Sequence, residues 1–129
     1  MKTVYDFLKK CEIFYVATAD HKRPHLRPFG AIEIWNNQLI VQTGRGKLVA
    51  AQLTENPFVE IVACDGENWM RISATAVEVS DPAAEEQIYR SYPYLRGVYT
   101  EKNPILVLAL TEVTAVWNPA EGTSRTVRF

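Results

Sequence analysis

The sequence predicts a single, mainly β domain with short α insertions, built around a six-stranded antiparallel barrel. Its 129 residues fit one domain, and a hydrophobic fraction of 47% is enough to form a core without disulfides. Apolar segments of strand length follow one another, and the helical patterns between them do not alternate regularly with strands as in a doubly wound sheet. Strands in this number would leave edges open to pairing with other chains, and a closed or partly open barrel protects these edges.

Each element follows from a local pattern. Strands are expected at residues 13–19, 25–35, 39–43, 58–64, 69–79 and 105–117, followed by a short β-like tail at 118–129. Helices are expected at residues 4–11, after a Thr3 cap, at 48–55, and at 82–92, after an Asp81 cap. Pro28 predicts a kink in the second strand, and Asn36-Asn37 predicts a hairpin turn after it.

Composition excludes several function classes. A formal net charge of −1 argues against binding to nucleic acid or to an acidic membrane surface. No run of 18 apolar residues is present, and the N-terminal residues do not resemble a secretion signal, so we expect a cytoplasmic protein. Cys11 and Cys64 lack metal-ligand spacing, so we expect two buried, reduced thiols and no metal site.

The strongest local motif is Thr43-Gly44-Arg45-Gly46-Lys47, between a strand and a helix. A helix N-terminus offers free N–H groups, and the two glycines allow a close approach of the backbone to a ligand. The basic side chains of Arg45 and Lys47 and the hydroxyl of Thr43 complete a possible phosphate cradle, although the spacing is not that of a P-loop. The alternative is a glycine-rich turn with solvated basic residues.

A second motif is His25-Leu26-Arg27-Pro28-Phe29, in which His25, Arg27 and Phe29 share one face of a strand. An arginine beside an aromatic ring suits a planar, partly anionic ligand. The alternative is an exposed edge with one arginine, and His21 and His25 are expected to be solvated. Most tyrosines near the last helix are expected in a core or interface, with a minority available to a planar ligand. No catalytic triad or carboxylate pair can be assigned.

These motifs together resemble the FMN-binding split-barrel proteins related to pyridoxamine 5'-phosphate oxidase. The resemblance rests on the order and spacing of four segments, 27–29, 43–47, 52–59 and 69–73, and it extends over nearly the whole chain. It implies a six-stranded split β-barrel that binds FMN at the interface of a homodimer. It places Arg27 beside the isoalloxazine, Thr43 against the flavin, and Arg45 and Lys47 at the phosphate, with residues of the opposite subunit completing the pocket.

The resemblance leaves three functions open. The first is an FMN-dependent oxidoreductase that acts on an unknown small substrate. Oxidation of pyridoxamine phosphate is not expected, because the basic loop is shorter and the C-terminal segment that grips that substrate is missing. The second is a non-catalytic FMN module for electron transfer, storage or sensing. The third is the same fold with a deazaflavin or haem, where His25 would matter more.

Overall fold

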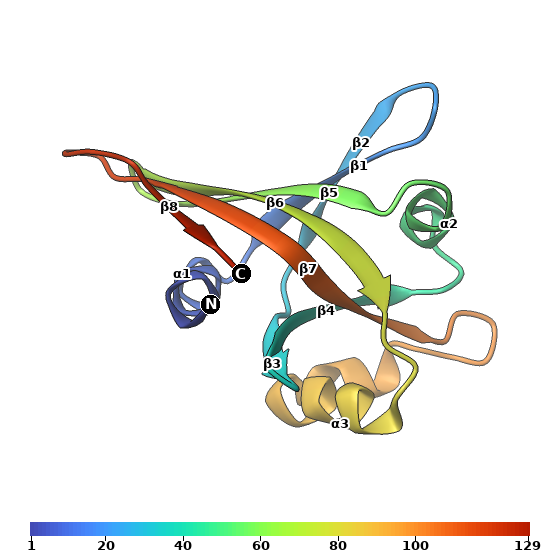
Figure 1. Cartoon of the computed structure of the whole chain (residues 1–129). Helices are drawn as coiled ribbons and strands as arrows, with labels where there is room; N and C mark the ends of the chain where they lie inside the picture. Colours follow the sequence, from blue (N-terminus) through green and yellow to red (C-terminus); the bar gives the residue numbers. More distant parts are fainter.

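The computed structural model describes residues 1–129 as one curled antiparallel sheet with helices around it (Figure 1). The helices are α1 (Lys2–Cys11), α2 (Leu48–Glu55), α3 (Pro82–Ser91) and the 3-10 helix η1 (Pro93–Gly97). The strands are β1 (Phe14–Ala19), β2 (Pro24–Phe29), β3 (Glu33–Trp35), β4 (Gln38–Gly44), β5 (Phe58–Asp65), β6 (Asn68–Glu78), β7 (Ile105–Asn118) and β8 (Arg125–Arg128). No helix is both long and apolar enough to cross a membrane.

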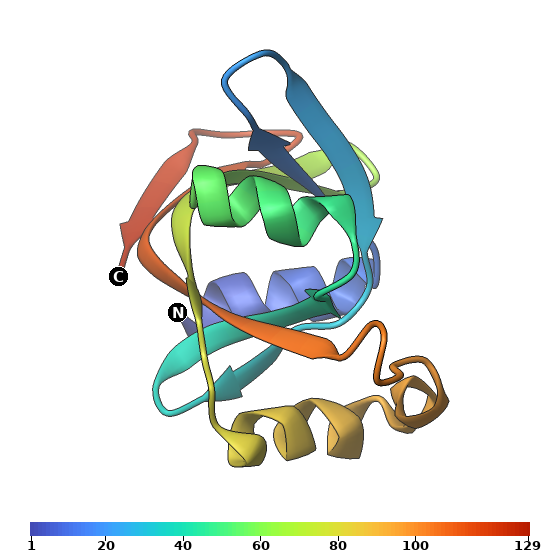
Figure 2. The same ribbon diagram turned by 90° about the vertical axis from the view of Figure 1, so that its right-hand side faces the viewer.

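The sheet is a split barrel. Its strands follow the order β2-β1-β5-β6-β7-β4-β3, and β8 pairs with β7 outside that path. The two ends of the path, β2 and β3, do not pair with each other, so the barrel stays open. Helices α1 and α2 lie at opposite ends of the curled sheet, and α3 lies beside β3 (Figures 1 and 2).

Strands β4 and β7 lie between two hydrophobic cores. Leu39 and Val41 of β4 belong to the larger core, which also contains Val4 and Leu8 of α1. Ile40 points the other way, into a smaller core formed with α3 and η1. Because both faces of β4 and β7 are covered, residues 105–110 are an unbroken apolar run rather than an alternating one.

Most predicted elements are confirmed. Helix α2 has the predicted bounds, and the side chain of Asp81 accepts a hydrogen bond from the backbone N–H of Ala83 to cap α3. Asn36 and Asn37 both have positive φ, at 50° and 59°, as a tight hairpin turn requires. The nearly continuous apolar segment at 58–64 is, as predicted, a central strand: it forms β5, between β1 and β6.

The predicted number of strands was wrong: the sheet has eight strands, not six. The segment at 25–35 is not one kinked strand but two, because β2 pairs with β1 whereas β3 pairs with β4. The tail forms a true strand, β8. The Thr3 cap was also wrong, since α1 already begins at Lys2 and Met1 occupies the cap position without a side-chain bond.

The expectation of two buried cysteines was also wrong. Cys64 is exposed and Cys11 is only partly buried. Cys64 lies on β5, where alternate side chains point to opposite faces, and its neighbour Ala63 is the one that enters the core.

Candidate functional site

A small pocket lies where β2, β4 and the N-terminus of α2 meet. Its volume is about 130 Å³, and its lining includes three of the four residues predicted to bind a cofactor: Arg27, Thr43 and Lys47. Gln42 and Tyr99 line it as well. Segments separated by about 70 residues of chain therefore converge on one site.

Arg27 is fixed in this site by neutral hydrogen-bond acceptors. Its Nη1 donates to the carbonyl of Val16 at 3.1 Å and to Oγ1 of Thr18 at 2.8 Å, and its Nη2 donates to Oε1 of Gln52 at 2.6 Å. Thr18 and Gln52 are themselves buried and joined by a hydrogen bond of 2.6 Å. No carboxylate pairs with Arg27, and burial lowers the pKa of its guanidinium. Of the five N–H donors that an arginine carries, two remain free for a ligand.

The glycine loop at 44–46 is held by the chain itself. A Cβ on Gly44 would collide with the side-chain amide of Asn103, so a larger residue there requires Asn103 to move. The backbone N–H groups of Arg45, Gly46 and Lys47 donate to the carbonyl of Pro104, to Oδ1 of Asn103 and to the carbonyl of Gly44. The close approach that the sequence assigned to a ligand is thus made by Asn103.

Lys47 and the first turn of α2 keep their donors free. Lys47 is exposed, caps α2 through its backbone, and forms no ion pair or side-chain hydrogen bond. The N–H groups of Leu48 and Val49, at the first two helical positions, have no partner in the chain. An anion beside Lys47 would therefore meet one ammonium group and two free backbone donors.

Arg45 lies outside the pocket. It forms an ion pair with Glu78 at the end of β6, and this hydrogen bond raises the pKa of its guanidinium. Its predicted contact with a phosphate requires that the pair with Glu78 be given up or shared. Both partners are about 44% exposed, so separating them costs little free energy.

Two further groups in the pocket were not among the predicted site residues. The Oε1 atom of Gln42 is buried without a hydrogen-bond partner, which is rare for a polar atom in a protein interior. Tyr99 is partly buried, and burial raises the pKa of its phenol to about 12, so it stays a neutral hydrogen-bond donor at ordinary pH. Both residues mark places where a bound ligand would find a polar partner.

The two histidines lie outside the pocket, in and beside the β1–β2 turn. Nδ1 of His21 lies 2.7 Å from Glu55, and Nε2 of His25 lies 2.9 Å from Asp20. His21 is exposed, as the sequence predicted, whereas His25 is half-buried and therefore less solvated than expected.

The comparisons with known proteins identify the family of the chain. Residues 1–117 match the family model described as pyridoxamine 5'-phosphate oxidase. The chain belongs to the pyridoxamine 5'-phosphate oxidase family. A search of curated proteins finds no match.

Solved structures with the split-barrel fold of this family carry different descriptions. A NimC/NimA family protein from Clostridium acetobutylicum is 26% identical, with a TM-score of 0.93 over 100% of this chain and 92% of that one. General Stress Protein 26 from Bacillus anthracis is 13% identical, with a TM-score of 0.78 over 99% and 97%. The haem storage protein HutZ from Vibrio cholerae is 16% identical, with a TM-score of 0.68 over 98% and 93%. At the last two identities the likeness shows the fold alone.

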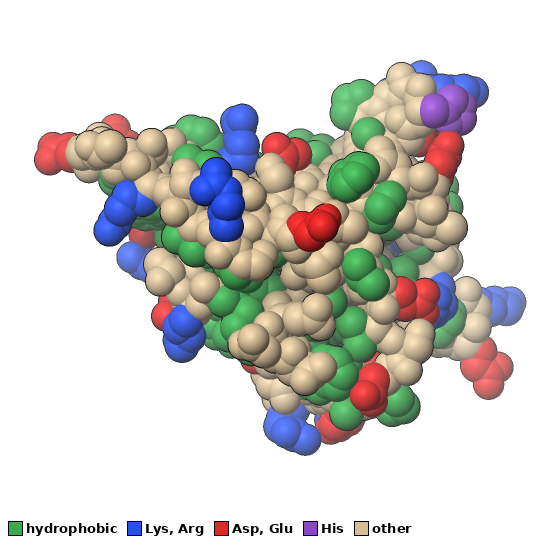
Figure 3. Space-filling model, viewed as in Figure 1, with side chains coloured by type: hydrophobic (Ala, Val, Ile, Leu, Met, Phe, Trp, Pro, Cys, Tyr) green, Lys and Arg blue, Asp and Glu red, His purple; other side chains and the backbone are tan.

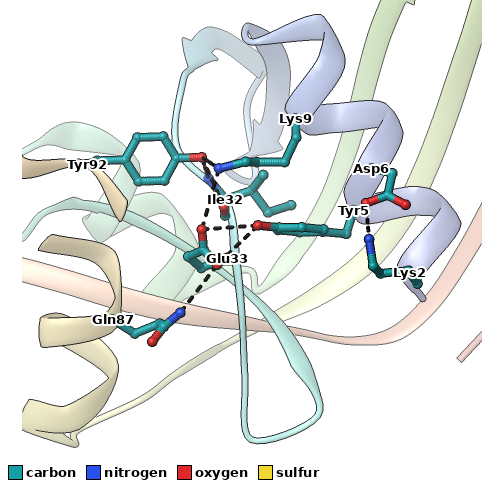
Figure 4. Close-up of polar contacts among 8 residues, drawn as sticks. All are labelled: Lys2, Tyr5, Asp6, Lys9, Ile32, Glu33, Gln87 and Tyr92. Atoms are coloured by element: carbon teal, nitrogen blue, oxygen red, sulfur yellow. Dashed lines mark hydrogen bonds and ion pairs between the residues drawn. The ribbon is translucent and has the colours of Figure 1, made fainter. Parts of the chain in front are cut away.

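The family resemblance did not reveal a polar cluster that joins α1, β3 and α3 (Figure 4). Glu33 is buried, with 7% exposed surface, and both of its oxygens lie 3.1 Å from the hydroxyl of Tyr5. Nζ of Lys9 lies 3.5 Å from Glu33 and donates to the hydroxyl of Tyr92 at 3.1 Å. That hydroxyl also bonds to the backbone N–H and carbonyl of Ile32. The cluster satisfies its own polar groups and holds α1 against the β2–β3 connection.

The sequence did contain a signal for the residues that hold Arg27. Gln52 lies on the face of α2 that also carries Val49 and Leu53, and all three are buried. A polar side chain on an apolar helix face must find a partner in the interior. Thr18 offered no such signal, because a threonine in a strand is ordinary.

Proposed function

We propose that this protein binds FMN in the pocket at Arg27, Thr43 and Lys47 and acts as an FMN-dependent oxidoreductase on a small substrate. The observation that carries the proposal is that three groups converge on this pocket. The charge of Arg27 is not neutralised by any carboxylate, Lys47 is unpaired at a helix N-terminus, and the buried Oε1 of Gln42 has no hydrogen-bond partner. Such a set suits a planar ring with polar edges that is joined to a phosphate.

Each group has a place in this proposal. Lys47 and the free N–H groups of Leu48 and Val49 hold the phosphate, and the hydroxyl of Thr43 contacts the flavin. Arg27, with its two remaining donors, lies beside the ring and favours negative charge there. Gln42 accepts from a ring N–H group. Bound FMN supplies hydride transfer, while the protein supplies position and electrostatics.

The volume of the pocket supports a homodimer with the flavin at its interface. Sites that enclose a ligand of this size usually measure about 300 Å³ or more, and one chain offers about 130 Å³. A second copy can supply the remaining walls. The outer face of β2, β1 and β5 is the candidate contact surface, because it exposes Tyr15, Leu26 and Phe58; β2 joins it to the pocket, since Arg27 lies on the opposite face of the same strand.

The absorption spectrum of the purified protein, after incubation with excess FMN and gel filtration, tests the proposal. Flavin bands that remain with the protein are expected. A Soret band in the protein as purified would instead favour haem. A deazaflavin spectrum would mean that the same pocket binds a deazaflavin in place of FMN. If flavin remains bound, steady turnover of a nicotinamide donor with an acceptor distinguishes an enzyme from a module that only stores or senses flavin.

A further inference from the structure

A second cavity lies at the other end of the molecule, between α1 and the strands β6, β7 and β8. Its volume is about 440 Å³, within the range of small-molecule sites. It shares no residue with the pocket at Arg27 and Lys47. Because α1 and α2 lie at opposite ends of the sheet (Figure 2), a ligand here would not touch the proposed flavin site.

The walls of this cavity are almost entirely apolar. Val4, Met70 and Ala115 are buried at its floor. Phe7 and Trp117 meet edge to face, with ring centroids 4.9 Å apart and planes at 78°. The indole of Trp117 is only partly buried and its N–H donates no hydrogen bond within the chain. The cavity thus has an aromatic wall made by Phe7 and Trp117.

The rim carries one cation that nothing neutralises. Lys10 pairs with Asp65 at 2.8 Å, and Asp6 pairs with Lys2. Arg125 forms no ion pair and no side-chain hydrogen bond, and it lines the cavity together with Val127. Figure 3 shows basic side chains on the left of the molecule, where Figure 1 places α1 and β8, with hydrophobic surface between them.

We propose that this cavity binds a small amphipathic carboxylate. Its apolar body would lie against Phe7, Met70 and Trp117, and its carboxylate would accept hydrogen bonds from the guanidinium of Arg125. The charge at the rim decides the class of ligand, because an amine would meet the same unpaired cation and be repelled. Arginine binds a carboxylate through two parallel N–H bonds, which fixes the head group while the apolar walls accept the chain.

The test uses octanoate as the anionic probe, with octan-1-ol and octylamine as probes of the same length. Trp117 reports binding by fluorescence, and calorimetry confirms the affinity. Octanoate should bind saturably and more tightly than either comparison compound. Arg125→Gln should weaken octanoate about tenfold and leave octan-1-ol unchanged. The matched control is Arg128→Gln, on the same strand but on the opposite face, which should leave both affinities unchanged.

A second variant keeps the test decisive. Val127 lines the cavity and is exposed enough for Val127→Trp to fold, and the larger side chain should abolish binding of octanoate and octan-1-ol alike. An unchanged circular dichroism spectrum and thermal unfolding midpoint would show that each variant is folded. The proposal is overturned if octanoate does not bind saturably, if octylamine binds as well, or if Arg128→Gln matches the effect of Arg125→Gln. The proposal is also overturned if the wild type does not bind octanoate and Val127→Trp has a different oligomeric state. That result would mean that a second copy of the chain occupies the cavity.

Discussion

Lys47 is the cation best placed to hold a phosphate, because it is unpaired and stands at the first turn of α2. A charge-assisted hydrogen bond contributes about 1.5–3 kcal/mol. Lys47→Ala should therefore weaken FMN roughly ten- to a hundredfold. Riboflavin has the same ring without the phosphate, so its affinity should barely change. Titration of both proteins with both flavins measures the difference, which should shrink as salt screens the charge.

The same titration has controls on the surface. Lys22, in the β1–β2 turn, is exposed and only its backbone N–H bonds to an acidic side chain, that of Asp20, so Lys22→Ala should change neither affinity. Arg45→Ala shows whether Arg45 leaves Glu78 for the phosphate. If Lys47→Ala loses affinity equally for FMN and riboflavin, or for neither, then Lys47 does not bind the phosphate.

Arg27 should act on the redox potential rather than on phosphate recognition. Its partners are all neutral, so its charge is not cancelled within the chain and can favour the anionic reduced ring. Arg27→Ala should lower the midpoint potential of bound flavin, by about 30 mV for every 1.4 kcal/mol of lost interaction. Spectroelectrochemical titration measures it, with Arg27→Lys expected to retain part of the effect. An unchanged or raised potential in Arg27→Ala would contradict this role.

Tyr99 should make stability depend on alkaline pH. Burial raises the pKa of its phenol from 10.0 to about 12, so the folded chain holds a proton in this range that the unfolded chain releases. The free energy of unfolding should therefore fall as pH rises from about 10 to about 12. Tyr99→Phe should show a smaller fall in urea denaturation, since only the other buried tyrosines contribute. An identical pH profile in the variant would show that Tyr99 is not protected.

At the residue scale the sequence identified Arg27, Thr43 and Lys47, and the structure brings these three to one pocket. It misjudged why Gly44 is a glycine, because Asn103 comes from a loop about 60 residues away. Contacts of that range leave no periodic pattern in the chain. The free atom of Gln42 was hidden for the same reason: only the fold shows which polar groups lack partners.

At the scale of elements, the Glu33 cluster should be what keeps α1 on the barrel. Burial, and next the charge of Glu33, raise the pKa of Tyr5, so its hydroxyl stays a donor to that carboxylate. Tyr5→Phe removes the donor and leaves Glu33 buried, at a cost of about 1.5–3 kcal/mol of unfolding free energy. Urea denaturation measures it. Tyr94→Phe is the control, because that hydroxyl is exposed and unbonded; equal stability in both variants would assign the cluster no such role.

Element boundaries were predictable where a local signal exists and not where pairing decides. The Asp81 cap predicted the start of α3, and Pro57 predicted the end of α2. By contrast, residues 25–35 read as one strand, since nothing local shows that its halves pair with opposite ends of an open sheet. The tail became a strand only because β7 extends far enough to pair with it.

At the scale of the whole molecule, we propose that a second copy of the chain completes the site. One chain encloses about 130 Å³, while the outer face of β2, β1 and β5 remains uncovered. Leu26 is 68% exposed on the edge strand β2, opposite Ala17 on β1. An apolar sheet face of this kind is expected to associate with a partner surface, and a two-fold pairing of copies would create two equivalent sites.

Sedimentation equilibrium at micromolar concentration tests the pairing. The wild type should sediment at twice the chain mass of 14.6 kDa. Leu26→Asp places a charge in the interface and should give monomers that bind FMN at least tenfold more weakly, because desolvating an unpaired carboxylate costs more than the association can supply. Tyr94→Asp adds the same charge to an exposed residue of η1 and should stay dimeric with full affinity. A wild-type monomer that is saturated with FMN would show that one chain completes the site by itself, and the partner would then have no role in binding.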